Sequence, residues 1–403
     1  MKISKLRFIY KICRTATQMK YSSLDMLEKL VSFDSVSRNS NLPLIDFIQD
    51  YLLSFGVKSE LIYNEEKTKA NLFANVGPNE TGGVILSGHT DVVPVDGQNW
   101  STDPFKVTEK GSKLYGRGTC DMKGFNAICL SLVPEMIKAG LKKPIQLAFS
   151  YDEEVGCVGA PSMIQKMRKI LPAAKAVIVG EPTLMKSVDG HKASIGIDTE
   201  VTGFEVHSSL LPTGVSAIMN AAKLVNWITN KNETHQERTP RQEDKMFVPP
   251  YTTLHVGKIS GGTASNITSK KCTFTMDIRC LPTDDGEALV KEYVDYSNLI
   301  KDDMRKTKAE ADILVSRHHW VPGLKPEKNG EAENLVRKLT GNNSTSKVSY
   351  GTEAGQFQQA GYSSIICGPG SIEQAHQANE YLDKTQLELG TKFIKSLITE
   401  LSN

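Results

Sequence analysis

The stretch VILSGHTD, residues 84–91, decides how the rest of the chain is interpreted. Three apolar residues typical of a buried strand are followed by Ser87 and Gly88, and then by His89 and Asp91. In a strand, residues two apart point to the same side, so His89 and Asp91 share a face. Two interpretations stay open from these residues alone: a hydrogen-bonded pair at a strand end, or a metal-binding histidine with its supporting carboxylate.

The size and charge of the chain favour a two-domain protein that acts on small or peptide-like partners. Its 403 residues exceed what one hydrophobic core usually accommodates. The 48 Lys and Arg residues nearly balance the 46 Asp and Glu residues, which argues against nucleic-acid or membrane-surface binding through bulk charge. No apolar run approaches the roughly 18 to 20 residues that span a bilayer. The seven cysteines lack CxxC spacing, which predicts reduced thiols and a cytoplasmic protein.

The N-terminus differs from the rest of the chain. It is rich in Lys and Arg and has no acidic residue before Asp25. It contains neither a continuous apolar segment nor a small-residue cleavage site. We interpret residues 1–18 as an extension that precedes an ordinary start at Met19, with an organellar targeting segment as the alternative.

The order of the predicted elements indicates an α/β main domain with an inserted module. Short apolar runs separated by helical stretches predict a mainly parallel sheet. Between residues 187 and 319 the predicted order β-α-β-β-α-β is that of a ferredoxin-like module. We therefore predict a main domain of residues 1–186 and 320–403, and we interpret the polar stretch 230–244 as a solvated loop. The apolar runs of the main domain are 84–86, 145–149, 176–179 and 364–367; the module has strands at 195–202, 252–259, 272–278 and 311–316 and helices at 216–229 and 285–304.

Acidic residues and histidines follow several of the predicted strands. In parallel sheets, ligands collect at the carboxyl ends of the strands. Buried carboxylates are costly unless they are paired or bind a metal. Each acid alone could cap a helix or pair with Lys or Arg, but together they predict cations. Zinc accepts mixed imidazole and carboxylate ligands, and two ions can share one bridging aspartate. The residues are His89, Asp91, Asp121, Asp152, Glu153, Glu154, Glu181 and His376.

From about residue 24 to its end the chain resembles a known family, the dinuclear metallopeptidases and deacylases of the M20 type. Five segments carry the resemblance: SGHTD (87–91), GRGTCDMKG (116–124), DEEVG (152–156), GEPT (180–183) and QAH (374–376). The resemblance implies a zinc-exopeptidase-like catalytic domain with a mainly parallel mixed sheet, and an inserted ferredoxin-like lid and dimerisation domain.

The resemblance also implies roles for the residues of these segments. Two divalent metal ions are expected, with zinc favoured and cobalt possible. His89 and Glu181 are expected to bind one ion, Glu154 and His376 the other, and Asp121 to bridge them. Asp91 is expected to accept a hydrogen bond from His89. Glu153 is the expected general base, which moves a proton from the attacking water to the leaving amine, and a cis peptide is expected after Asp121.

Three residues of the inserted module resemble family positions that contact the substrate. His207 corresponds to a histidine that reaches the neighbouring subunit's active site and stabilises the oxyanion, which implies a homodimer through the module. Asn266 and Arg279 correspond to contacts with the substrate carboxylate. Arg279 could equally belong to a structural ion pair.

The segments YGTEAGQF (350–357) and GPGSI (368–372) are similar to the family's deacetylases of N2-acetyl-L-ornithine. Glu353 is expected to face the substrate's distal ammonium. Gly351 and Thr352 are expected to donate hydrogen bonds to the substrate's carboxylate. The predicted reaction releases acetate and L-ornithine in arginine biosynthesis. The alternatives are a broader N-acyl-amino-acid deacylase, a succinyl-diaminopimelate desuccinylase or a dipeptidase, and, in a different class, a metal-dependent binding protein without catalysis.

Overall fold

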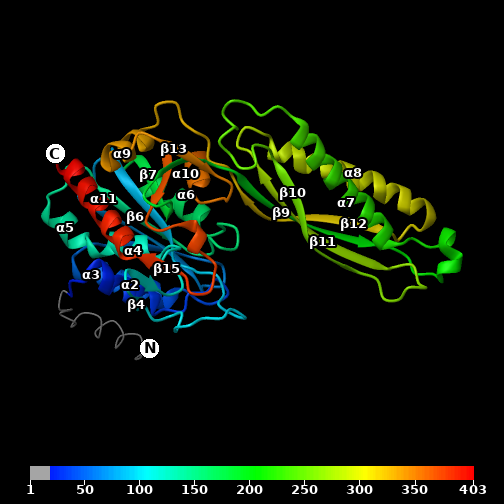
Figure 1. Cartoon of the computed structure of the whole chain (residues 1–403), viewed down its shortest axis with the longest axis horizontal. Coiled ribbons are helices and arrows are strands. Elements are labelled where there is room, and N and C mark those ends of the chain that lie inside the picture. The colour runs from blue at the N-terminus through cyan, green and yellow to red at the C-terminus, as the bar shows by residue number, and fades with distance from the viewer. Residues whose placement is uncertain (1–18) are drawn as a thin grey trace, which may run out of the picture.

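The structure, a computed structural model, describes residues 19–403, so the prediction for residues 1–18 lies outside the described residues. Figure 1 shows two lobes joined by a narrow junction. One lobe contains the large sheet and most of the helices, and the other contains a smaller sheet with two long helices. No helix in residues 19–403 is long and apolar enough to cross a membrane. The six cysteines in this range are all buried and unpaired.

The large lobe is built on an eight-stranded sheet in the order β1-β2-β6-β3-β7-β14-β8-β13. Its central strands β6, β3, β7 and β14 are parallel, so their carboxyl ends lie along one edge. These are the four strands that the apolar runs predicted. The strands are β1 (Ser59–Tyr63), β2 (Ala70–Val76), β3 (Gly83–His89), β6 (Ile145–Ser150), β7 (Ala174–Pro182), β8 (Ser187–His191), β13 (Thr345–Val348) and β14 (Ser364–Gly368); a small separate sheet contains β4 (Thr108–Lys110), β5 (Lys113–Tyr115) and β15 (Tyr381–Asp383).

Helices cover both faces of the large sheet, because its central strands are apolar on both sides. One face packs against α2, α3, α4, α5, α9 and α11, and the other against α6 and α10. The helices are α2 (Ser23–Val31), α3 (Leu42–Ser54), α4 (Lys123–Ser131), α5 (Val133–Lys138), α6 (Ala160–Ile170), α9 (Glu331–Thr340), α10 (Ala354–Gln359) and α11 (Lys384–Ser402).

The inserted module has the predicted ferredoxin-like arrangement. The chain order is β9 (Ala193–Thr202), α7 (Ala217–Glu237), β10 (Thr253–Gly261), β11 (Lys271–Cys280), α8 (Gly286–Thr307) and β12 (Asp312–Val321). The strands pair antiparallel in the order β10-β11-β9-β12. Figure 1 shows α7 and α8 side by side along this sheet. A separate apolar core lies between the sheet and the helices.

Two details differ from the sequence-based interpretation. β8 pairs with β13 and β14 of the large sheet, so the change of lobe falls between β8 and β9, a few residues after the predicted boundary at 187. The loop predicted for residues 230–244 is wrong up to Glu237, because α7 continues that far. Asn232 exchanges hydrogen bonds with the backbone of Leu254, and the buried His235 ring bonds the carbonyl of Thr252 at 2.8 Å. These tertiary contacts hold helical turns that the polar composition did not predict.

The junction between the lobes consists of two adjacent chain crossings. The backbones of His191 and Leu324 exchange hydrogen bonds of 3.2 and 3.1 Å, which hold the outgoing and returning segments together. The loop after α7 makes a further contact, since the Ser349 hydroxyl donates to the Val248 carbonyl at 2.5 Å. The lobes are therefore joined at a small contact region, and β9, β11 and β12 reach it with their ends.

Candidate metal centre

The predicted metal-binding side chains meet at the carboxyl edge of the parallel strands. His89 is the last residue of β3, and Glu181 lies near the end of β7. Glu154 lies in the loop after β6, and His376 follows the 3-10 helix η2 (Ile372–Gln374) after β14. Asp121 comes from the loop before α4, and the Asp121–Met122 peptide is cis, as expected.

Asp121 stands between two groups of ligands and presents one carboxylate oxygen to each. Its Oδ1 lies 3.1 Å from His89 Nε2, which is itself 3.8 Å from Glu181 Oε1. Its Oδ2 lies 3.2 Å from His376 Nε2, which is 2.9 Å from Glu154 Oε2. The two pairs therefore lie on opposite sides of one carboxylate, which is the arrangement that a bridging aspartate between two ions requires.

The cluster is chemically suited to cations. Glu181 is 4% exposed, and its Oε1 has no hydrogen-bond partner among the described residues. Ligand atoms of His89, Glu153 and Glu181 lie within 4.8 Å of one another, and so do those of His89, Asp121 and Glu154. A buried carboxylate oxygen without a partner is costly, and a divalent cation offers such an oxygen a ligand position. The residues present therefore fit two divalent ions with imidazole and carboxylate ligands.

The electrostatics of the cluster follow from burial and from the proximity of the acids. Burial, together with repulsion from Asp121, raises the pKa of Glu154 to about 7. Burial also raises the pKa of Glu153 to about 8, with repulsion from Glu154 and Asp121 opposing the attraction of His89. Burial and repulsion from Asp121 raise the pKa of Glu181 as well. Asp121 is the exception: burial opposes its ionisation, but hydrogen bonds from His376 and His89 hold its pKa below the usual range.

Within the stretch at 87–91, Gly88, His89 and Thr90 each have a separate structural role. A Cβ atom at Gly88 would lie 2.2 Å from the Asn126 side-chain oxygen, so glycine lets α4 approach β3. The Asn126 amide then donates to the His89 carbonyl at 2.6 Å. The Thr90 hydroxyl donates to the Ser150 carbonyl at 2.7 Å, which ties the ends of β3 and β6 together.

Asp91 supports the site differently from the expectation that its carboxylate would hold His89. The His89 Nδ1 atom lies 2.8 Å from the backbone carbonyl of Asp91 and 3.7 Å from its carboxylate. The carbonyl therefore accepts the ring N–H and leaves Nε2 to face Asp121. The Asp91 carboxylate instead accepts hydrogen bonds from the backbone N–H groups of Glu153 and Glu154, at 3.1 and 3.3 Å. It thus positions the loop that carries Glu153 and Glu154.

A cavity of about 520 Å³ opens beside the cluster and lies between the lobes. Glu153, Glu154 and His376 line it from the large lobe. Arg279, His318 and His319 line it from the inserted module. His319 bonds the Ser194 hydroxyl at 2.9 Å and packs against the loop at Gly156, where an added Cβ would lie 2.6 Å from the His319 side chain. Glu153, Glu154 and His376 therefore face a space that both lobes enclose.

Two of the predicted substrate contacts line this cavity and two lie behind it. Arg279 and Gly351 are in the lining, and the Arg279 Nε donates to Asp277 at 2.9 Å, so the ion pair and the cavity position coexist. Thr352 and Glu353 are buried, at 0% and 1% exposure. Glu353 accepts hydrogen bonds from the hydroxyls of Ser87 and Ser150 beneath the strand ends. Its carboxylate therefore supports the sheet edge and does not reach the cavity, contrary to the expected ammonium contact.

His207 and Asn266 lie together, but far from the cavity of their own chain. The Ser208 N–H donates to the Asn266 carbonyl at 2.8 Å, and both predicted residues are exposed. They follow the ends of β9 and β10 that are remote from the junction, whereas Ser194 at the other end of β9 lines the cavity. Thr202 lies eight residue steps beyond Ser194, about 26 Å of strand at ~3.3 Å per step. His207 therefore does not reach the metal ligands within one chain.

The most important residue that sequence analysis missed is Glu380. It is 1% exposed, and its carboxylate accepts hydrogen bonds from the N–H groups of Gly118, Cys120 and Asp121 at 2.9 to 3.0 Å. It also pairs with the buried Arg117 at 2.7 Å. Glu380 thus holds the loop that presents Asp121. The only sequence signal was Arg117 itself, since a buried guanidinium requires a buried acid as its partner.

We expect Glu380→Gln to weaken metal retention. The substitution leaves Arg117 without its counter-charge and gives the loop at Asp121 a weaker acceptor. Losing one member of a buried ion pair costs about 3–5 kcal/mol of stability, and disturbing the groups behind metal ligands costs roughly 10–100-fold in metal affinity. Thermal unfolding and the metal content after dialysis measure both effects. Glu388→Gln, on the exposed face of α11, is the matched control; equal metal content in the two variants would contradict this role of Glu380.

Comparison with known proteins agrees with this geometry. Residues 85–400 match the model of peptidase family M20/M25/M40. An acetylornithine deacetylase of Pasteurella multocida is 34% identical over 383 residues, which cover 94% of this chain and 96% of the relative. An acetylornithine deacetylase of Proteus mirabilis is 33% identical, with 94% and 95% covered.

Solved structures share the fold at lower identity. An M20 family metallo-carboxypeptidase of Sulfolobus solfataricus has a TM-score of 0.74 at 17% identity, with 95% of this chain and 99% of that chain covered. A dinuclear metal-binding peptidase of the M20 family from Bacillus subtilis has a TM-score of 0.61 at 14% identity, with 94% and 97% covered. The cluster around Asp121, the two-lobed fold and the match over residues 85–400 together establish that the chain belongs to peptidase family M20/M25/M40.

Proposed function

We propose that this protein is an amide hydrolase that removes the acetyl group from N2-acetyl-L-ornithine. The observation that carries the hydrolase assignment is the cluster centred on Asp121, with Glu153 beside it in the cavity wall. The choice of substrate is supported by the deacetylase relatives, which match along almost the whole chain. The carboxypeptidase and dipeptidase among the structural neighbours make dipeptides and other N-acyl amino acids the alternatives to test.

The residues of this chain have defined tasks in the proposed reaction. His89, Glu181, Glu154 and His376, with Asp121 between them, would hold two divalent ions, zinc or cobalt. Bound there, such ions acidify water and polarise the acyl oxygen. Glu153 takes the proton of the attacking water at its carboxylate and returns it to the leaving nitrogen. Its side chain lines the cavity, where it can reach both the attacking water and the leaving nitrogen of a bound substrate.

Arg279 is the cavity residue that we assign to the substrate carboxylate. Its guanidinium can form paired hydrogen bonds with a carboxylate, and the bond from Nε to Asp277 fixes its orientation while leaving the terminal nitrogens free to bind. Gly351 lies in the same wall and can supply backbone contacts. Because Glu353 is buried, the substrate's distal ammonium is not assigned to it.

We further propose a homodimer in which each module serves the partner's site. His207 is exposed and remote from its own cavity, so a second chain is needed to bring it to a reacting acyl group. Exposed apolar side chains lie on the segments around it, at Leu210 (56%), Met219 (59%) and Ile259 (55%). Exposed apolar surface of this kind is typical of protein contact sites. In the dimer, His207 would donate a hydrogen bond to the oxyanion formed at the acyl carbon. The unpaired cysteines support a cytoplasmic enzyme.

The substrate assignment predicts a clear order of rates. With zinc or cobalt supplied, amine release from N2-acetyl-L-ornithine should exceed that from N-succinyl-diaminopimelate, N-acetyl-methionine and a dipeptide. Glu153→Gln should lower turnover by roughly 100-fold or more, the usual contribution of a general base. Faster release from another substrate would overturn the deacetylase assignment but keep the hydrolase. Absence of metal-dependent turnover on all four would favour a binding protein instead.

The dimer predicts recovery of activity when two inactive variants are mixed. In a heterodimer of His207→Ala and Glu153→Gln chains, one site has an intact Glu153 and faces the partner's intact His207. If chains exchange randomly, half of the dimers are mixed and half of their sites are active, so about a quarter of wild-type activity should return. Turnover after unfolding and refolding the mixture measures it. His255→Ala, at an exposed histidine of β10, should stay active. Failure of the mixture to recover activity would show that His207 does not act across a dimer.

A further inference from the structure

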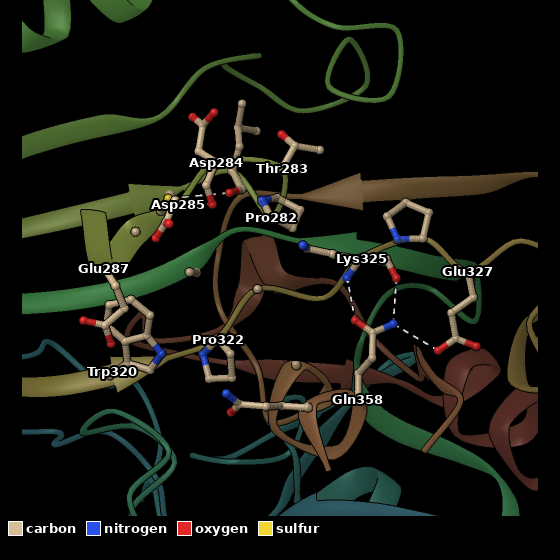
Figure 2. Close-up of a pocket in the computed structure, with 18 residues that line it drawn as sticks. Pro282, Thr283, Asp284, Asp285, Glu287, Trp320, Pro322, Lys325, Glu327 and Gln358 are labelled. Atoms are coloured by element: carbon tan, nitrogen blue, oxygen red, sulfur yellow. Dashed lines mark hydrogen bonds between the residues drawn. The ribbon is translucent and has the colours of Figure 1, made fainter. Parts of the chain in front are cut away.

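A second pocket lies at the junction of the lobes, on the face opposite the metal-site cavity. It has a volume of about 730 Å³ and is shown in Figure 2. Neighbouring residues of the same strand ends line the two spaces. Ser194, Arg279 and Val321 line the metal-site cavity, whereas Ala193, Cys280 and Trp320 line the second pocket. Since successive strand residues face opposite sides, the two spaces lie back to back across β9, β11 and β12. We call the second space the rear pocket.

The rear pocket is acidic, but most of its acids already have partners. Asp284 accepts hydrogen bonds from Arg241 at 3.2 Å and from Thr252 at 2.5 Å. Glu287 pairs with Arg317 at 2.8 Å. Glu327 accepts hydrogen bonds from Gln358 at 3.0 Å and from the hydroxyl of Ser363. Arginines therefore balance the charges of Asp284 and Glu287, whereas Glu327 has neutral hydrogen-bond partners and keeps its negative charge.

Two opposite charges in the rear pocket remain available. The Lys325 ammonium, on the large lobe, has no hydrogen-bond or ion-pair partner among residues 19–403. Asp285, on the inserted module, uses one carboxylate oxygen to cap α8 by accepting from the Ala288 N–H at 3.0 Å, and its other oxygen has no partner in the same range. Figure 2 shows Lys325 and Asp285 on different walls of the pocket. A ligand with both charges would satisfy both groups.

Both charged residues are mounted on fixed backbone. Gln358 clamps the backbone of Lys325 on both sides, since its side-chain oxygen accepts from the Lys325 N–H at 2.8 Å and its amide donates to the Lys325 carbonyl at 2.7 Å. Asp285 is fixed by its capping bond at the start of a 22-residue helix. Trp320, Pro282 and Pro322 supply apolar wall between them. The backbones of both residues are therefore fixed, while their exposed side chains can turn toward a ligand in the pocket.

We propose that the rear pocket is a binding site for a free α-amino acid with a cationic side chain. The ligand's carboxylate pairs with the Lys325 ammonium, and its cationic end pairs with the free oxygen of Asp285. The methylene chain packs along Trp320 and the two prolines. The excess of acidic residues in the lining favours a ligand with net positive charge over a neutral amino acid. The product class of the proposed reaction has this chemistry.

Binding in the rear pocket should slow hydrolysis. Because the two spaces lie back to back at one junction, any rotation that brought the lobes together over the metal site would widen the rear pocket. A ligand that bridges Lys325 and Asp285 holds the rear walls at their present separation and opposes that rotation. It thus binds one arrangement of the lobes better than the other, which is the condition for coupling between sites. This effect on turnover depends on the proposed function, whereas the binding itself does not.

The test is calorimetric titration of the full-length Glu153→Gln protein, loaded with zinc, with L-ornithine, L-lysine or L-arginine. Because ornithine can also occupy the metal-site cavity as a product, the variants decide which site is measured. Lys325→Ala and Asp285→Asn, each combined with Glu153→Gln, should weaken binding of at least one of these amino acids by roughly ten-fold, the size of one lost charged contact. Asparagine also caps helices, so Asp285→Asn leaves α8 capped. Lys328→Ala, at an exposed lysine outside the pocket, should bind normally.

Two probes and one kinetic measurement complete the test. Norvaline, which lacks the cationic end, and putrescine, which lacks the carboxylate, should both bind more weakly than L-ornithine. In otherwise wild-type protein, Lys325→Ala should keep its basal turnover and lose inhibition by L-lysine, which is not the product of the proposed reaction. Equal affinity in Lys325→Ala, Asp285→Asn and the parent protein, or no binding of any of the three amino acids, would overturn the proposal. Both of these results come from binding measurements on the Glu153→Gln protein. They therefore do not depend on which substrate the active enzyme hydrolyses.

Discussion

The structure depends on one electrostatic constraint: four carboxylates and two imidazoles are held together at the edge of a sheet, and only the His376 side chain is more than half exposed. Asp121, Glu153, Glu154 and Glu181 cannot all be ionised there without opposite charge, as the raised pKa values of the three glutamates show. The histidines supply part of that charge through Asp121. Two divalent cations would supply the rest, and the same positive charge would activate water and a bound acyl group.

The surrounding protein holds these groups in place through backbone contacts. The Asp91 carboxylate fixes the N–H groups of the loop with Glu153 and Glu154, and its carbonyl orients His89. Glu380 does the same for the loop before Asp121, with its charge balanced by Arg117. These bonds involve N–H groups that no ladder of the sheet satisfies. The loops at the strand ends therefore have defined conformations, and the ligands approach one another with little freedom to separate.

The sequence predicted the parts of this arrangement that follow from periodicity and motifs. Apolar runs located the central strands, and the resemblance located His89, Asp121, Glu154, Glu181 and His376, which the structure brings together. The sequence could not show that the Asp91 backbone carbonyl, and not its carboxylate, accepts the hydrogen bond from the His89 ring. Alternation along a strand determines which side a residue faces, but not which of its atoms forms the bond. Glu353 was misjudged because its partners Ser87 and Ser150 are more than 200 residues away in the sequence. Glu380 is likewise 263 residues from Arg117, and no local pattern connects them.

If the Asp121 carboxylate joins two cation sites, calorimetric titration with zinc should detect both of them. Protein that has been stripped with a chelator and dialysed is titrated, and the metal content is then measured by mass spectrometry. We expect two zinc ions per wild-type chain and a weakening of both sites in Asp121→Asn, because the two oxygens of Asp121 face the two groups of ligands. A single ion per wild-type chain, or an Asp121→Asn variant that still binds two with unchanged affinity, would contradict the bridging role of Asp121.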